Sequence, residues 1–368
     1  MKLIVKTLLG AEEILSKELQ SLGATNVEVA KKNVTCEADK ETLYKICYCA
    51  RLATRVMVNL LEFPAEDAND IYNNVRAFDW SSIISPKRTM CIDHVSFSQK
   101  LGDSDYIALK VKDDIMDQLR EKIDATPRLS DDNPDVLVNV HATDERVTVS
   151  IDSCGAPLNR RGYRPENLEL DVTNEVMAAA LVELSGWTPD QTLIDPMCGT
   201  GTICIEAAMK GRNIPAQMFR KYPFGFENTL DFDPELWAKV KADAESKITS
   251  NRLRISGSDV DTEAIDIAKM TTLDMKLTTE VRINRRSVRE QSRMTQEGVV
   301  ITCPPTDPEQ TKRGLEDLYK EITHYMARNF LDHDVWIYST SEDALDAIPF
   351  DAEKEIPFAE GSFNLYPF

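Results

Sequence analysis

Hydrophobic and polar residues alternate with two different periods along the first part of the chain. The segment 10–24 repeats its leucines at helical spacing and ends near Gly23, a residue type that favours a helix end. The segment 135–153 instead alternates apolar and polar residues around a polar turn, which is typical of a β-hairpin. Similar runs fill the rest of this part, so the pattern predicts two small α+β units, over residues 1–60 and 66–152.

From Asn174 onwards, short apolar runs alternate regularly with amphipathic segments. Five of these runs have the composition of buried strands: TLIDP, RISGSD, VRINRR, GVVIT and VWIYST. Because parallel strands require crossover helices, this alternation predicts a parallel, doubly wound α/β sheet. The connector GAPLNRRGYRPENLELD, which contains Gly and Pro, marks the expected domain boundary in front of it.

The length of 368 residues exceeds what one hydrophobic core usually supports, so two or three domains are expected. Apolar residues make up 42% and charged residues 29%, as in ordinary soluble globular proteins. There is no long apolar run, and Met1–Gly10 is too short and polar for a signal peptide, so we expect a cytoplasmic protein without a membrane partner. The eight cysteines form no Cys-x-x-Cys pair, so we expect neither a disulfide framework nor a metal site.

The formal charge of −19 disfavours indiscriminate nucleic-acid binding, because lysine and arginine supply most of the non-specific affinity for phosphates. We therefore expect no DNA partner, and any RNA surface must be local. The connector is either a solvated linker anchored by its tyrosine or a segment that contacts RNA phosphates and bases. The candidate RNA contacts are Lys31 and Lys32 in a predicted turn, and Arg160, Arg161, Tyr163 and Arg164 in the connector.

The sequence LIDPMCGTGT places an aspartate and two glycines between a strand and a helix. Gly199 and Gly201 let the backbone approach a ligand closely, and the helix N-terminus offers free N–H groups. The third glycine of the dinucleotide fingerprint and the Gly-Lys-Ser/Thr of a Walker A loop are both missing. Asp195 at the strand end suits a cationic or hydroxyl-bearing ligand better than pyrophosphate.

Asp259 closes the next strand, RISGSD. An acidic residue at this position can accept hydrogen bonds from both ribose hydroxyls of a nucleoside, although it can also simply cap the following helix. Asp261 lies directly before Thr262 and a helical segment, so it is better placed to act as the cap. Together with the Gly-rich loop, Asp259 predicts a nucleoside-containing ligand.

Several motifs in this order resemble those of a known family: KTLLGAEEILSKEL, NRRGYR, DPMCGTGT, IEAAMKGRNIPA and SGSDVDTEAIDIAK. The chain is similar, essentially end to end, to the THUMP-containing, S-adenosylmethionine-dependent RNA methyltransferases, in particular to the N-terminal half of the bacterial 23S rRNA guanine-N2 methyltransferases. The resemblance implies a ferredoxin-like module over 1–65, a THUMP RNA-binding domain over 66–155 and a Rossmann-like class I methyltransferase domain over 160–368. It also implies S-adenosylmethionine as the cofactor and ribosomal RNA as the partner.

The resemblance also implies roles for the residues of the candidate site. The cofactor would contact Asp195, Pro196, Cys198, Gly199 and Gly201 at its methionine end, Asp259 at its ribose, and Ser287 where the family usually has an aspartate that binds the adenine amine. The family's catalytic loop reads Asn-Pro-Pro-Tyr: its amide and first proline carbonyl accept hydrogen bonds from the target amine, and its ring stacks on the base. Here the loop reads Cys303, Pro304, Pro305 and Thr306, so the amide and the ring are replaced.

Cys303 leaves two interpretations open: a nucleophile, as in enzymes that methylate a pyrimidine carbon, or a small buried residue. The primary hypothesis is direct methyl transfer to an exocyclic guanine amine (N2) of ribosomal RNA, without metal or covalent intermediate, with the Pro304 carbonyl facing the target amine. The alternative is a catalytically weakened descendant that binds RNA as an assembly factor. A small-molecule methyltransferase is disfavoured by the RNA-type units at the N-terminus.

Overall fold

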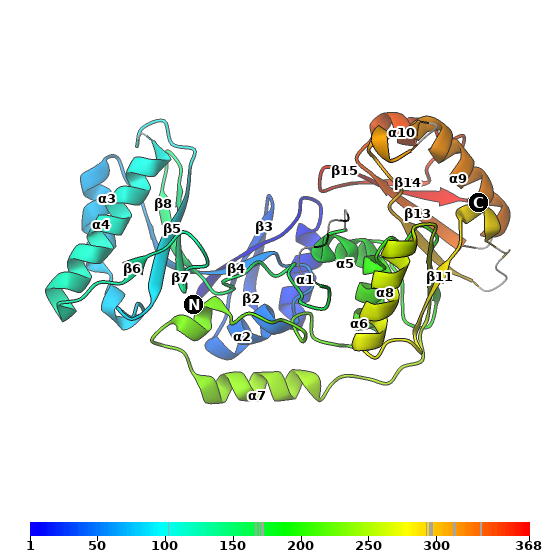
Figure 1. The fold of residues 1–368 in the computed structure, drawn as a ribbon. Coiled ribbons are helices and arrows are strands. Elements are labelled where there is room, and N and C mark those ends of the chain that lie inside the picture. The colour runs from blue at the N-terminus through cyan, green and yellow to red at the C-terminus, as the bar shows by residue number, and fades with distance from the viewer. Residues whose placement is uncertain are drawn as a thin grey trace.

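The computed structural model describes all of residues 1–368 except 102, 166, 167, 169, 171, 172, 292, 294–296, 312, 313 and 332. Three parts lie in a row: residues 1–65 (the first module) lie between residues 66–155 (the second module) and the C-terminal domain from residue 160 onwards (Figure 1). Among the described residues, no helix combines the length and hydropathy needed to cross a membrane.

Helices and strands of the first two modules occupy the segments in which the hydrophobic periodicity predicted them. The first module contains β1 (Lys2–Lys6), α1 (Glu12–Ser21), β2 (Thr25–Ala30), β3 (Asn33–Glu37), α2 (Lys40–Cys49) and β4 (Arg55–Phe63). The second contains α3 (Ala68–Ala77), η1 (Trp80–Ser82), β5 (Thr89–Ser96), α4 (Ser104–Ile123), β6 (Arg128–Leu129), β7 (Val136–Ala142) and β8 (Val147–Asp152). The helices α2, α3 and α4 each begin after an aspartate whose side chain accepts a backbone N–H of the first turn: Asp39, Asp67 and Asp103.

Both modules share one sheet, in the strand order β2-β3-β1-β4-β8-β7-β5-β6. The strand β4 joins them, because it pairs with β1 near its start and with β8 along the rest of its nine residues. In this register, Val58 lies opposite both Leu3 and Ile151. The two α+β units that the sequence pattern predicts are therefore parts of one continuous sheet.

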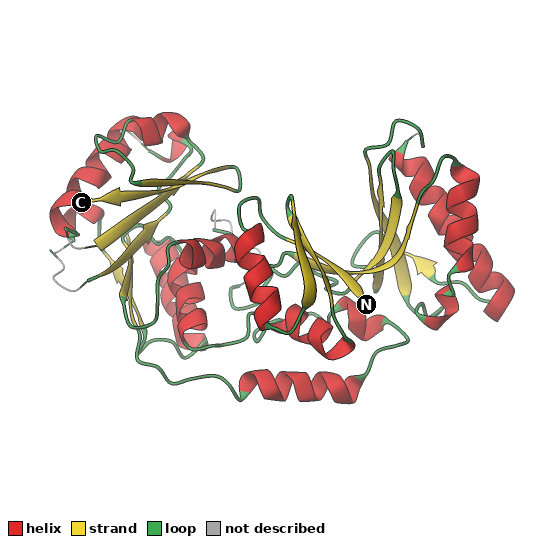
Figure 2. Ribbon diagram, turned by 180° about the vertical axis from the view of Figure 1, so that it is seen from behind, coloured by secondary structure: helices red, strands yellow, loops and turns green. Residues whose placement is uncertain are grey.

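The helices α1 to α4 cover one face of this sheet, and the other face is polar. On β1, Leu3 and Val5 are buried in the core formed with α1 and α2, whereas Lys6 points to the opposite side. In the second module, a separate core lies between the strands and the helices α3 and α4, which run side by side (Figure 2). We call the side that carries Lys6, Asn139 and His141 the polar face.

The C-terminal domain contains α5 (Glu175–Leu184), β9 (Thr192–Asp195), α6 (Thr202–Gly211), η2 (Gly225–Asn228), α7 (Pro234–Glu245), β10 (Arg254–Asp259), α8 (Thr262–Asp274), β11 (Val281–Arg285), η3 (Val288–Glu290), β12 (Gly298–Thr302), η4 (Pro308–Gln310), α9 (Leu315–Asn329), β13 (His333–Ser339), α10 (Glu342–Asp346), β14 (Lys354–Phe358) and β15 (Gly361–Pro367). Its sheet has the order β11-β10-β9-β12-β13-β15-β14. The strands β9 to β13 pair in parallel, which confirms the predicted doubly wound arrangement. By contrast, β15 runs antiparallel to both β13 and β14, and it forms a hairpin with β14 through the short turn at Ala359 and Glu360.

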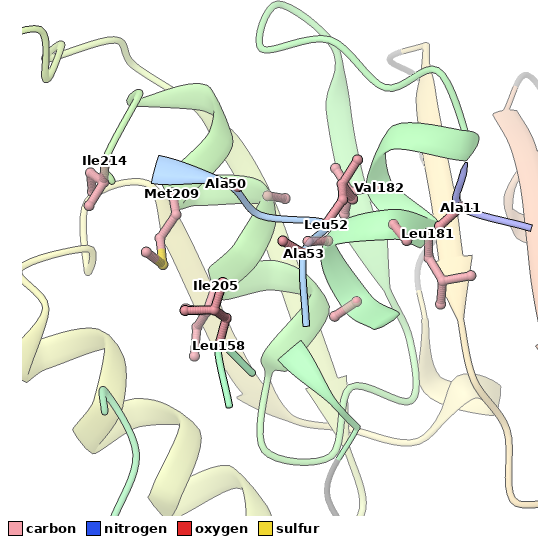
Figure 3. Close-up of a cluster of buried hydrophobic side chains, with 14 of the residues drawn as sticks. Ala11, Ala50, Leu52, Ala53, Leu158, Leu181, Val182, Ile205, Met209 and Ile214 are labelled. Carbon is pink, nitrogen blue, oxygen red and sulfur yellow. The ribbon is translucent and has the colours of Figure 1, made fainter. Parts of the chain in front are cut away.

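The first module and the C-terminal domain share a hydrophobic core. Ala50, Leu52 and Ala53, which follow α2, pack among side chains of the C-terminal domain and of the connector that precedes it (Figure 3). The partners labelled there are Leu158, Leu181, Val182, Ile205, Met209 and Ile214. Because a close-packed core resists rearrangement, it fixes the first module relative to the sheet that carries the candidate site.

The aromatic-rich insertion over residues 219–237 forms a second link between the parts. Its Phe226 stacks on Tyr44 of α2, with ring centroids 4.4 Å apart. The N–H of Leu230 donates to the carbonyl of Ile83 in the second module at 2.9 Å. The insertion therefore connects the C-terminal domain to both N-terminal modules.

Candidate functional site

The ends of three neighbouring strands bring the predicted site residues together. Asp195 ends β9, Asp259 ends β10, and Cys303 follows β12. The strand β9 lies between β10 and β12, so the strand order reverses at this point of the sheet. Open α/β sheets bind their ligands at such a switch point, outside the carboxyl ends of the strands.

The two glycines of the loop between β9 and α6 serve different purposes. Gly199 has φ +50°, and a Cβ built on it would meet no atom within 4 Å beyond its chain neighbours. Gly201, the N-cap of α6, has φ +79°, and a Cβ there would lie 3.2 Å from Cβ of Ala268 in α8. Gly199 therefore leaves room for a ligand, while Gly201 allows α6 to pack closely against α8.

Asp259 fixes this loop from the neighbouring strand. Its Oδ2 accepts the N–H of Gly199 at 2.9 Å, and its Oδ1 accepts the N–H of Asp261 at 3.0 Å. Asp261 caps α8 through the N–H of Ala264, as its position in the sequence predicts. An ionised carboxylate has about four acceptor positions, so Asp259 keeps capacity for ribose hydroxyls.

Asp195 is buried between the Gly-rich loop and the end of β12. Desolvation raises the pKa of its carboxyl to about 7, although the hydrogen bond from the Met197 N–H, at 3.2 Å, favours the ionised form. The nearby carboxylate of Asp259 raises this pKa further. The charge at this position therefore depends on what binds beside it.

Pro196, Cys198 and Ser287 make hydrogen bonds within the protein around the same loop. The carbonyl of Pro196 accepts the hydroxyl of Ser258 at 3.5 Å, and the N–H of Cys198 donates to the carbonyl of Ser258 at 2.9 Å. Ser287 caps η3, and its hydroxyl donates to Oε2 of Glu290 at 3.2 Å. Direct contact of these three residues with a cofactor stays a prediction.

A buried tyrosine lies beneath the candidate catalytic loop, residues 303–306. The hydroxyl of Tyr319, on α9, lies 2.8 Å from Oγ of Ser339 and 3.5 Å from the carbonyl oxygen of Pro304. Burial raises the pKa of Tyr319 to about 12, so this hydroxyl remains protonated and can donate to the carbonyl. The sequence does not reveal this role, because a tyrosine on an amphipathic helix reads as an ordinary core residue.

Cys303 and Thr306 are both half-buried at the end of β12. Burial raises the pKa of the Cys303 thiol well above its usual value, and the charge of Asp195 raises it further. A thiol that stays protonated is a poor nucleophile, so the structure favours the interpretation of Cys303 as a small uncharged residue.

Two residues of the connector are buried against the first module and α6. Arg161 is 0% exposed and donates to the carbonyls of Leu158 at 3.0 Å and Arg51 at 2.6 Å. Its Nε lies 3.5 Å from Oε1 of Glu206, which also accepts the hydroxyl of Tyr163 at 3.0 Å. These side chains tie the connector to its surroundings and leave no surface for a nucleic acid.

Arg164 is buried as well and positions the Gly-rich loop. It donates to Oγ1 of Thr200 at 3.2 Å and of Thr202 at 3.1 Å, and it forms an ion pair with Glu175 of α5. The prediction that the connector cluster contacts RNA is therefore wrong for its three buried members, because tertiary partners already use their polar groups. Arg160 is exposed, so its contact with RNA stays a prediction.

Lys31 and Lys32, which we call the lysine turn, are exposed between β2 and β3. Glu12 fixes this turn, since its Oε1 accepts the N–H of Lys32 at 2.8 Å and its Oε2 accepts the N–H of Gly10 at 2.7 Å. The residue before Gly10 accepts the N–H of Ala359 at 2.7 Å through its carbonyl. The lysine turn is thus linked to the β14–β15 hairpin, which projects from the C-terminal domain towards the first module (Figure 1).

Comparison with protein-family models divides the chain in a similar way. An RlmL ferredoxin-like domain matches residues 2–57, and a THUMP domain matches residues 65–152. An RMKL-like methyltransferase domain matches residues 161–364, which is more than half of the chain.

Relatives and solved structures agree with these matches. The chain is 30% identical to ribosomal RNA large subunit methyltransferase K/L of Photobacterium profundum over 96% of its length, but it spans only about half (51%) of that relative. It is also 30% identical to a putative RNA methyltransferase of Synechocystis, over 96% of this chain and 92% of the relative. The putative methyltransferase SMU.472, solved in complex with SAH, superposes with a TM-score of 0.87 at 27% identity, over 100% of this chain and 97% of that one. The chain therefore belongs to the RMKL-like methyltransferase family, with a ferredoxin-like domain and a THUMP domain in front of its methyltransferase domain.

Proposed function

We propose that this chain transfers a methyl group from S-adenosylmethionine to the exocyclic N2 amine of a guanine in ribosomal RNA. The observation that supports it most is the open side of Gly199 next to the Asp259 carboxylate, at the switch point of a methyltransferase sheet. The names of the two curated relatives support an RNA substrate, one of them ribosomal RNA. The SAH in the related structure is the demethylated form of the proposed cofactor.

The residues at the strand ends fit a cationic nucleoside cofactor. Gly199 has no side chain where the ligand would approach, and Asp259 keeps acceptor positions for ribose hydroxyls. A cation beside Asp195 would favour its ionised form, which burial otherwise opposes. When bound, S-adenosylmethionine supplies the electrophilic methyl group.

The catalytic loop orients the target amine. An amine conjugated to a purine ring is a weak nucleophile, so orientation and proximity must supply much of the rate. The carbonyl of Pro304 accepts one N–H of this amine, and Tyr319, fixed by Ser339, keeps the carbonyl in position from the protein side. Cys303 takes no covalent part, because its thiol stays protonated.

The replaced loop residues favour a second candidate function. The sulfur of Cys303 is a weak acceptor, and Thr306 has no ring on which a base can stack. A chain with slow transfer could still bind RNA as an assembly factor. Incubation with labelled S-adenosylmethionine and unmodified ribosomal RNA separates the two: transferred label supports the methyltransferase, and RNA binding without label supports the assembly factor.

Asp259→Ala is expected to weaken S-adenosylmethionine binding by about 10- to 150-fold, because a hydrogen bond to a charged group contributes about 1.5 to 3 kcal/mol. The variant removes both the ribose acceptor and the anchor of the Gly199 N–H. Isothermal titration calorimetry measures the affinity. Asp261→Asn, which keeps the cap of α8, is the matched control and should bind normally. If Asp259→Ala and the unaltered chain bound the cofactor equally well, the ribose contact would be contradicted. If neither bound S-adenosylmethionine or SAH, the proposed methyltransferase activity would be contradicted.

The lysine turn and Arg160 are expected to bind RNA phosphates. Each phosphate contact that is lost should flatten the slope of log K against log salt concentration by about one unit, so the triple variant Lys31→Ala, Lys32→Ala, Arg160→Ala should lose about three. Filter binding of unmodified ribosomal RNA at several salt concentrations measures this slope. Lys17→Ala, exposed on α1 in the same module, is the control. An unchanged slope in the triple variant would place the RNA surface elsewhere.

A further inference from the structure

Phe97 presents an aromatic ring to solvent directly after β5, in the second module. Its side chain is 72% exposed, more than any other large hydrophobic residue that the structure describes. The ring lies beside the ring of His141, with centroids 5.7 Å apart and planes inclined at 53°. Because Val95 and His141 are partners in the β5–β7 ladder, Phe97 projects from the same polar face two residues further on.

The backbone around Phe97 is fixed by hydrogen bonds. The N–H of Phe97 donates to the carbonyl of Ala142 at 2.8 Å, so it extends the ladder beyond β5. In the next residues, Oδ1 of Asp144 accepts the hydroxyl of Ser98 at 2.9 Å and the N–H of Gln99 at 2.8 Å. The backbone that carries the exposed ring is therefore fixed. This distinguishes Phe97 from an apolar residue that is exposed because it lies in a flexible loop.

One cation of the first module acts electrostatically on the aromatic pair. Partial burial lowers the pKa of His141, and the ammonium of Lys6 on β1 lowers it further, so the imidazole is neutral near neutral pH. On the same face, the ion pair with Asp152 of β8 raises the pKa of Arg55 on β4, and the carboxylate of Asp93 on β5 adds a smaller effect. The aromatic pair thus belongs to a surface that also includes a lysine of the first module.

We infer that Phe97 and His141 form a stacking platform for one unpaired base of the RNA substrate. The inference rests on the proposed function, because it assumes that the chain binds RNA. Any base can stack on an exposed aromatic ring, and Lys6 can meet the phosphate of the same strand. A protein partner fits less well. Stable protein interfaces bury about 1,000 Å² or more, and the apolar surface that Phe97 shares with Val95, which is 45% exposed, is much smaller than that.

The first module lies between the platform and the domain that carries the candidate active site. From Lys6 at the end of β1, the chain continues through residues 7–10, which contact the β14–β15 hairpin through Ala359. An RNA strand that crosses the polar face from Phe97 would pass Lys6 and then the lysine turn before it reaches the methyltransferase domain. In Figure 1 the first module, which carries these lysines, lies between the second module and that domain.

Two variants of Phe97 test the platform. All four tryptophans are buried, between 0% and 6% exposed, so Phe97→Trp adds a single exposed indole as a fluorescent probe. Addition of unmodified large-subunit ribosomal RNA should quench and shift its emission. Phe97→Ala should weaken RNA binding by about 5- to 150-fold without changing the salt slope, because stacking releases no counterions. The matched control is Tyr106→Ala, a 46% exposed aromatic residue on α4, on the opposite side of the second module.

The outcomes separate this inference from the proposed function. Quenching together with weaker binding of Phe97→Ala at an unchanged slope supports the platform. Normal RNA affinity of Phe97→Ala, while the lysine variants still flatten the slope, overturns the platform and leaves the proposed function intact. Emission of Phe97→Trp that changes with protein concentration in the absence of RNA also overturns it, in favour of a contact with a second copy. If the unaltered chain binds no ribosomal RNA, the proposed function fails and the platform fails with it.

Discussion

Replacing Arg161 with methionine is expected to lower the free energy of unfolding by about 3 to 5 kcal/mol. The guanidinium is fully buried, donates to two backbone carbonyls and pairs with Glu206, which is also buried. Methionine has a similar volume, but it leaves the two carbonyls without this donor and the Glu206 carboxylate without its cation. Urea unfolding followed by tryptophan fluorescence measures the change in midpoint and slope.

Arg160 provides a matched control for this experiment. It has the same side chain and is the preceding residue, but it is exposed, so Arg160→Met should change stability by less than about 0.5 kcal/mol. The double variant Arg161→Met, Glu206→Met should recover part of the loss, because the Glu206 carboxylate is then removed together with the cation that pairs with it. If Arg161→Met were as stable as Arg160→Met, the buried ion pair would contribute nothing to the junction between the first module and the C-terminal domain.

The burial of the connector's side chains could not be predicted from the local sequence. The motif NRRGYR has the same composition whether its cations face solvent or protein, and the acidic partner of Arg161 and Tyr163 lies on α6. Burial of these side chains follows from the packing of α6 against the first module, which no local pattern encodes. By contrast, consecutive residues are enough to indicate the glycine turn between β9 and α6 and the cap by Asp261, so the sequence is sufficient to predict both.

The partners of a strand are likewise not encoded in its own sequence. The segment RVMVNLLEF reads clearly as a strand, but nothing in it says that it pairs with both β1 and β8. A register shift between Asn59 and Leu61 accompanies the second pairing, and such irregularities are set by the partner strand. Likewise, Phe97 continues an ordinary alternating strand in the sequence, and only the fold shows that no element among the described residues covers its ring.

The double variant Cys303→Asn, Thr306→Tyr is expected to transfer methyl groups about 5- to 150-fold faster than the unaltered chain. Both positions are partly exposed where β12 ends, so new side chains there can reach a base at the switch point of the sheet. The amide would add an acceptor beside the Pro304 carbonyl. The ring would add a stacking surface that contributes about 1 to 3 kcal/mol if it is fully used in the transition state. Single-turnover transfer of labelled methyl to unmodified ribosomal RNA measures the rate.

Ser287→Asp serves as the control, because it changes a residue predicted to contact the adenine amine and leaves residues 303–306 unaltered. It should raise cofactor affinity while the single-turnover rate at saturating cofactor stays the same. If the double variant is no faster than an already active native chain, Cys303 and Thr306 suit a target or geometry other than a stacked guanine. If neither the double variant nor the unaltered chain transfers methyl groups while both bind RNA, the assembly-factor function is favoured. The contact between Tyr319 and the Pro304 carbonyl would then stabilise a loop without catalytic activity.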